Sequence, residues 1–139
     1  MKEEAIFCEL PKFSRTPQTI TILLVDDEEA IRTITRQVLE SFGYRVLEAQ
    51  AGETASGIYV NHKDEIDLVI LDLNMPGMSG QVCLQKLLEI EQGVKVLVAS
   101  GYSDKGMENT VLAQGASGFL QKPFTLNNLM ERVQGLLKQ

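Results

Sequence analysis

The sequence predicts an α/β fold in which a parallel five-stranded sheet carries helices on both faces. From Thr19 onward, short apolar runs alternate five times with segments whose apolar residues recur at helical spacing. The apolar runs are almost continuous, and this is typical of strands that are buried on both faces of a parallel sheet. The length of 139 residues fits a single domain.

The regular pattern begins only after a segment of mixed polarity. Residues 1–18 contain two prolines and no sustained period, so we interpret them as a tail or linker and expect the folded domain at 19–139. The first strand is expected at Ile20–Val25 and the first helix at Glu28–Phe42, ended by Gly43. The apolar stripe of this helix consists of Ile31, Ile34, Val38 and Phe42.

The rest of the chain continues the alternation. Further strands are expected at Tyr44–Ala49, Ile66–Leu71, Val94–Ala99 and Gly118–Leu120. Further helices are expected at Glu53–Asn61, Gln81–Glu91, Lys105–Gln114 and Leu126–Leu137. Asn74–Gly80 reads as a loop because two glycines and a proline lie within it. Right-handed crossovers then favour a flavodoxin-like, doubly wound (βα)5 sheet with strand order 2-1-3-4-5.

Composition excludes several classes of function. The net charge of −6 argues against a nucleic-acid-binding surface, which requires clustered Lys and Arg. No apolar run approaches the ~20 residues that span a bilayer, so we expect a cytoplasmic protein without membrane contact. Cys8 and Cys83 do not have metal-ligand spacing, and we expect unpaired thiols in a reducing compartment.

Polar residues follow four of the predicted strands. Asp26 and Asp27 follow the first strand, Asp72 the third, Ser100 the fourth and Lys122 the fifth. In a parallel sheet these positions lie at one edge, where ligands bind. Several carboxylates in one place repel one another and are costly to desolvate unless a cation joins them.

The residue types at this edge indicate phosphoryl chemistry. Oxygen ligands without nearby His or Cys favour a hard divalent ion, magnesium in the first place, with manganese as an alternative. Asp72 beside such an ion would attack a phosphoryl group and form an acyl phosphate. Lys122 would neutralise the transferred charge, and the Ser100 hydroxyl would bond a phosphoryl oxygen.

Each of these residues also has a plainer interpretation. Asp26 and Asp27 are good helix N-cap residues, and Asp72 alone fits a turn. Ser100 and Lys122 alone would be ordinary surface residues. Their joint placement at successive strand ends is what favours a common site.

Four runs of the chain resemble the receiver domains of response regulators and hybrid histidine kinases. The similarity covers roughly 19–139, and the blocks agree with that family in type, order and spacing. The runs are LLVDDE (23–28), VILDLNMPGMSG (69–80), VASG (98–101) and GASGFLQKPF (115–124).

The resemblance implies a role for each acidic residue. Asp72 matches the phosphorylated aspartate of the family. Asp27 matches the direct metal ligand, and Asp26 matches its partner, which acts through water. Asn74 matches the position whose backbone carbonyl completes the metal site. Together with Tyr102, Asn74 is expected to set the rate of dephosphorylation.

The resemblance also implies a conformational relay. Ser100 matches the switch hydroxyl, and Lys122 matches the lysine that accompanies the phosphorylated residue in the family. A cis peptide bond is implied between Lys122 and Pro123. Phe119 matches the switch aromatic, although an ordinary core residue is the alternative at that position.

The partners are implied in the same way. A histidine kinase or a histidine phosphotransfer protein would be the phosphodonor, and the SGYSD stretch (100–104) with GASGFLQKPF resembles receivers attached to hybrid sensor kinases. A homodimer through the face formed by Lys105–Gln114, Gly118–Leu120 and Leu126–Leu137 stays open. The acidic residue typical of winged-helix regulators is replaced by Gly118, with Arg132 as the remaining basic partner.

Two rival functions are weighed against the phosphoryl-accepting switch. A phosphohydrolase with an aspartyl nucleophile would need a general acid two residues after the nucleophile, where Asn74 stands and cannot donate a proton. A binding module that no longer takes phosphate would not be expected to keep a complete and costly acidic cluster.

Overall fold

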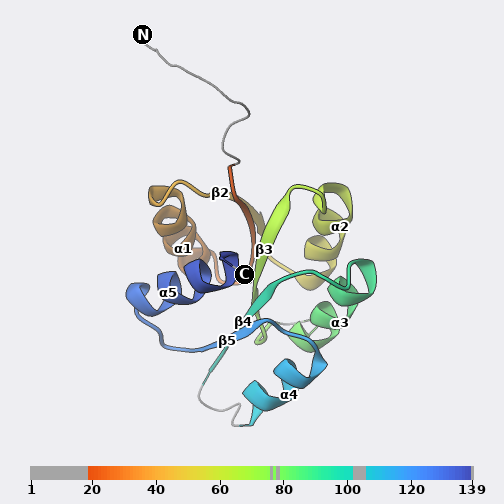
Figure 1. Cartoon of the computed structure of the whole chain (residues 1–139). Helices are drawn as coiled ribbons and strands as arrows, with labels where there is room; N and C mark the ends of the chain where they lie inside the picture. The colour runs from red at the N-terminus through yellow and green to blue at the C-terminus, as the bar shows by residue number, and fades with distance from the viewer. Residues whose placement is uncertain (1–18, 76, 78, 102–105, 139) are drawn as a thin grey trace.

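The computed structural model describes residues 19–75, 77, 79–101 and 106–138 and contains one five-stranded parallel sheet (Figure 1). The strand order is β2-β1-β3-β4-β5, which confirms the predicted topology. The strands are β1 Thr21–Val25, β2 Arg45–Ala49, β3 Ile66–Asp72, β4 Val96–Ser100 and β5 Gly118–Gln121. The tail or linker at 1–18 with Cys8, the role of Tyr102 and the predicted helix start at Lys105 lie outside the described residues.

Five helices alternate with the strands, as the sequence predicts. They are α1 Glu29–Ser41, α2 Gly52–His62, α3 Gly80–Ile90, α4 Met107–Gln114 and α5 Leu126–Leu137. The helix α5 has the predicted bounds, and most other ends differ by one residue. The predicted fourth strand began too early, because the Val94 N–H turns back to the Glu91 carbonyl at 3.2 Å before β4 starts.

The helices form two layers, one on each face of the sheet. In Figure 1, α1 and α5 lie on one side, and α2, α3 and α4 lie on the other. Successive strand residues point to opposite faces, so Leu24 packs with α1 and α5 while Leu23 packs with the other three helices. Both faces of the sheet are therefore buried, which explains why the strands read as continuous apolar runs.

The apolar stripe of α1 is only partly a core face. Ile31, Ile34 and Phe42 are 39%, 53% and 52% exposed, so much of the predicted stripe does not pack against the sheet. The helix instead turns Thr35 and Leu39 toward the sheet, one turn apart. Val38 is half-buried against this core, and Ile31 and Ile34 line a shared surface with Leu126 of α5.

The carboxyl ends of the strands form one edge of the sheet. The Lys122–Pro123 peptide bond that follows β5 is cis, as the family resemblance implies. Among the described helices, none combines the length and the apolar character that crossing a membrane requires.

Candidate functional site

The acidic pair follows β1 in a tight turn. Asp26 is buried, and its backbone N–H donates to the Ala49 carbonyl at 3.1 Å, which ties the turn to the end of β2. The Asp26 Oδ1 accepts a hydrogen bond from the Glu28 N–H at 2.9 Å. These bonds turn the chain from β1 into α1 and leave Asp27 closer to solvent than its neighbour.

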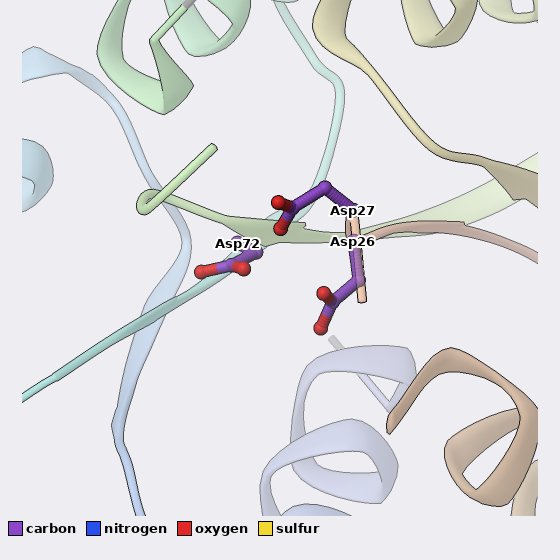
Figure 2. A group of neighbouring side chains, drawn as sticks. All are labelled: Asp26, Asp27 and Asp72. Atoms are coloured by element: carbon purple, nitrogen blue, oxygen red, sulfur yellow. The ribbon is translucent and has the colours of Figure 1, made fainter. Parts of the chain in front are cut away.

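Asp72 ends β3 and lies beside the acidic pair. Figure 2 shows the side chains of Asp26, Asp27 and Asp72 together, and one carboxylate oxygen of each lies within 4.8 Å of the others. The Lys122 Nζ is 3.2 Å from Asp72 Oδ2 and 3.8 Å from Asp26 Oδ2. The convergence that the strand ends predicted is therefore confirmed for all three acids and the lysine.

The electrostatics of this cluster affect Asp26 most clearly. Burial, and secondarily the Asp72 carboxylate, raises the pKa of Asp26 above its ordinary value, although the Glu28 N–H and Lys122 act in the opposite direction. The ionised form of Asp26 is therefore a net cost to the folded protein.

This cost makes stability depend on pH in a definite direction. Because the pKa of Asp26 is raised on folding, the folded protein keeps the Asp26 proton over a pH range that begins at ~4, where the unfolded chain already loses it. The folded state therefore becomes less stable as pH rises through this range. We expect Asp26→Asn, without divalent cations, to raise the melting temperature at pH 7 by a few degrees.

The difference in melting temperature between Asp26→Asn and the wild type should disappear as pH falls below the raised pKa of Asp26, because wild-type Asp26 is then also neutral. Thermal unfolding by circular dichroism across pH 4–8 measures this. Asp64→Asn, on an exposed residue, is the matched control and should show no such gap. A gap that widened toward acid pH would contradict the prediction.

Ser100 and Lys122 lie at neighbouring strand ends. Ser100 is fully buried at the end of β4. The Lys122 N–H donates to the Ser100 carbonyl at 2.7 Å, so the backbone itself holds the lysine next to the hydroxyl residue. Phe119, one strand turn earlier on β5, is buried in the cluster between the sheet and α2, α3 and α4.

Asn74 connects two loops of the site. Its N–H donates to Asp72 Oδ1 at 3.0 Å, and its side-chain Oδ1 accepts from the Gly101 N–H at 3.3 Å. The loop after β3 is thereby tied to the loop after β4. An amide at this position cannot serve as a general acid, which disfavours the phosphohydrolase alternative.

The chemistry of the cluster suits a hard divalent cation. Within the described part of the chain, the group that could hold a metal consists of Asp26, Asp27 and Asp72, which offer carboxylate oxygens only. Oxygen ligands of this kind fit magnesium or manganese and do not fit zinc or copper, which prefer imidazole or thiolate. The acidic cluster is thus able to bind a metal.

An apolar groove with a volume of about 480 Å³ opens beside the site, between α1 and the start of α5. Exposed residues of α1 line it, and so do Lys122 of the site and Gly101 after β4. Its lining residues are Glu28, Ile31, Ile34, Thr35, Gly101, Lys122, Pro123, Phe124 and Leu126. Sequence reasoning missed this groove, because it depends on how far α5 covers α1.

Sequence reasoning also missed Arg32, whose guanidinium donates to the Asp26 carbonyl oxygen at 2.7 Å. Arg32 and Arg36 lie one turn apart on the same helix, and the sequence does not indicate which of the two contacts the site.

Comparisons with known proteins agree with this geometry. The family model described as the response regulator receiver domain matches residues 22–134 of this chain. Sensor kinase CckA of Brucella abortus (strain 2308) is 36% identical over 119 residues, which are 86% of this chain and 13% of that protein. The chain therefore spans only a small part of this relative.

Two solved structures are similar throughout the described fold. A response regulator receiver domain protein from Clostridium thermocellum has a TM-score of 0.82 and 28% identity, covering 86% of this chain and 94% of the other. A chain of a CheX-CheY-BeF3-Mg2+ complex from Borrelia burgdorferi has a TM-score of 0.81 and 30% identity. The match covers 86% of this chain and 90% of the other.

Proposed function

The chain belongs to the response regulator receiver domain family and is a phosphoacceptor signalling switch, and from that premise we propose that Asp72 is the residue that accepts the phosphoryl group. The observation that carries this assignment is the position of Asp72, buried within 4.8 Å of two further acids and 3.2 Å from the Lys122 ammonium. We propose that the receiver domain comprises 19–139 and that 1–18 is a tail or linker.

In the proposed reaction an Asp72 carboxylate oxygen attacks the phosphorus of a phosphohistidine. The P–N bond breaks as the P–O bond of the acyl phosphate forms, and the electron pair leaves with the imidazole nitrogen, which solvent protonates. The Lys122 ammonium balances charge on the phosphoryl oxygens, and the Ser100 hydroxyl donates to one of them. The site residues gather from the ends of four strands, so this arrangement needs the intact fold.

Magnesium, with manganese as a substitute, would neutralise charge on the carboxylates and on the phosphoryl oxygens when bound. Asp27 and Asp72 would bind it directly, Asp26 through water, and Asn74 through its backbone carbonyl. The oxygen-only donor set supports this choice of ion. The Asp27 side chain is closer to solvent than Asp26, which supports its role as a ligand that a cation can reach from solution.

Ser100 and Phe119 would then change conformation in response to the added phosphoryl charge. Movement of the Ser100 hydroxyl toward the phosphoryl group would release space next to β5, and the Phe119 ring would turn into it. The hydrogen bond between Lys122 N–H and the Ser100 carbonyl supports coupling between the two strand ends. Asn74 and Tyr102 would set the lifetime of the acyl phosphate.

The proposed context is a cytoplasmic two-component pathway. The phosphodonor would be a histidine kinase or a histidine phosphotransfer protein, and the domain would be a stand-alone regulator or a module of a hybrid kinase. Nucleic acid and membrane contact are not proposed for this domain. A homodimer through α4, β5 and α5 stays an alternative, with Arg132, which donates a hydrogen bond to the Phe119 carbonyl, as its basic residue.

Acetyl phosphate, a small phosphodonor, tests the function directly. With magnesium, we expect the protein to gain the mass of one phosphoryl group in an acid-stable, base-labile form, as an acyl phosphate requires. Chelation of magnesium with EDTA should prevent the gain. Binding of beryllofluoride only in the presence of magnesium would support the same site without covalent chemistry.

The apolar groove supports a docking position for the phosphohistidine donor. Ile31 and Ile34 are exposed on α1, Leu126 is 48% exposed at the start of α5, and Lys122 lines the same groove. A donor helix seated on these residues would bring its histidine to the edge of the sheet where Asp72 lies. Exposed apolar side chains beside a reactive site are a common feature of such contacts.

Ile34→Ala should therefore separate the two kinds of donor. With a phosphohistidine donor that phosphorylates the wild type, we expect the transfer rate at limiting domain concentration to fall about tenfold, because an anchoring contact is lost. Phosphorylation by acetyl phosphate should be unchanged, since this small donor does not need the groove. Radiolabel transfer followed on gels measures both rates.

Val60→Ala is the matched control, because Val60 is 55% exposed on α2 and does not line the groove. It should leave both rates unchanged. Equal loss of rate with both donors in Ile34→Ala would place the effect in the phosphorylation site and contradict docking at the groove.

A further inference from the structure

Arg32 buries a charged side chain beneath the turn that carries the acidic pair. Its side chain is only 12% exposed, although arginine is usually a surface residue. The Nη1 donates to the Asp26 carbonyl oxygen at 2.7 Å, and the Nε donates to Glu48 Oε1 at 2.9 Å. The proposed phosphoryl chemistry assigns no role to this residue.

Glu48 holds the guanidinium in place. It lies on β2 opposite Leu24 of β1, and its second oxygen forms an ion pair with Arg36, 3.0 Å from the Nε atom. Arg36 also pairs with Glu40, on the exposed side of α1. One carboxylate thus binds two arginines of the same helix, but only the first of them reaches the backbone of the site.

The carbonyl that Arg32 binds belongs to the peptide bond between Asp26 and Asp27. Because a peptide unit is planar, the direction of this carbonyl also determines where the Asp27 N and Cα atoms lie. The preceding N–H is held by the Ala49 carbonyl at 3.1 Å. Arg32 therefore restrains the peptide that orients the Asp27 carboxylate relative to Asp72.

We propose that Arg32 is a positioning residue for divalent-cation binding. It holds the Asp26–Asp27 peptide so that the three carboxylates already face one another when the cation arrives. This inference rests on the proposed function, because it takes Asp27 and Asp72 as the ligands. Loss of a residue that orients metal ligands typically lowers metal affinity about 10- to 100-fold.

Arg32→Ala and Arg32→Lys, titrated with magnesium chloride in a calorimeter, test the proposal. We expect Arg32→Ala to weaken magnesium binding about tenfold or more. Arg32→Lys should restore part of the affinity, because an ammonium can reach the carbonyl but lacks the planar fork that bonds the carbonyl and Glu48 together. Circular dichroism without magnesium shows whether each variant is folded at the titration temperature.

Arg36→Ala is the matched control, because it removes a partner of the same Glu48 carboxylate without touching the backbone of the site. It should bind magnesium as the wild type does. Glu48→Gln should give an intermediate loss, since it frees the Arg32 guanidinium but leaves its bond to the carbonyl. This variant and Arg32→Lys also serve as the test if Arg32→Ala fails to fold.

The outcomes separate this inference from the proposed function. A wild-type protein that binds no magnesium would overturn the proposed function. Wild-type magnesium binding that is unchanged in every folded Arg32 variant would overturn the positioning role alone. Equal losses in Arg32→Ala and Arg36→Ala would assign the effect to the Glu48 ion pairs in general and would also overturn it.

Discussion

Asp72→Asn is expected to abolish phosphorylation of the domain, both from acetyl phosphate and from a phosphohistidine donor. The carboxylate oxygen is the attacking atom in the proposed reaction, and an amide is a far weaker nucleophile. The substitution also removes one of the three charges that would hold magnesium, so beryllofluoride binding should be lost as well. Intact-protein mass spectrometry after incubation with acetyl phosphate and magnesium measures the result.

Asp67→Asn is the control for this variant. It makes the same chemical change on the same strand, at the opposite end of β3, where Asp67 Oδ2 accepts the Thr21 N–H at 2.9 Å and Asn can still accept it. Phosphorylation should proceed as in the wild type. If Asp72→Asn retained a stoichiometric phosphoryl group on another residue, the assignment of the acceptor would be wrong.

Gly80→Ala is expected to cause the largest loss of stability among small substitutions in this chain. A Cβ at position 80 would lie 2.4 Å from Leu73 Cα and 2.9 Å from the Asp72 carbonyl oxygen, which are backbone atoms that cannot rotate away. Overpacking of this kind costs about 2–3 kcal/mol, which corresponds to a fall of roughly 10 °C in melting temperature.

The same substitution should weaken the site, because the strained backbone belongs to Asp72 and the residue after it. We expect lower magnesium affinity in folded Gly80→Ala, measured by calorimetry below its melting temperature. Gly135→Ala is the control: Gly135 lies inside α5 with nothing within 4 Å of the added carbon, so the protein should gain about 0.5–1 kcal/mol. A Gly80→Ala protein as stable as the wild type would contradict this interpretation.

The sequence alone determined the fold and the membership of the acidic cluster. Apolar runs such as Ile66–Leu71 must be buried on both sides, and the helical segments between them leave room only for parallel strands joined by crossovers. That topology brings the carboxyl ends of β1, β3 and β5 to one edge, which is why the sequence alone groups Asp27, Asp72 and Lys122.

The tertiary structure decided what depends on distances between elements. The stripe Ile31, Ile34 and Phe42 has the correct period for a helix, but period does not specify which part of a helix a neighbour covers. The sequence likewise did not predict the close approach of Gly80 to the backbone of Leu73, because a glycine in a predicted loop also fits an ordinary turn.

The bond from Arg32 to the Asp26 carbonyl shows the same limit most clearly. Local spacing makes Arg32 and Arg36 equivalent, because both lie on one face of α1 within reach of Glu48. Only the packing of α1 against β1 and β2 brings one guanidinium, and not the other, under the turn of the acidic pair. Hydrophobic period and strand order are properties of a chain segment, whereas a contact between a side chain and a distant carbonyl is a property of the packed molecule.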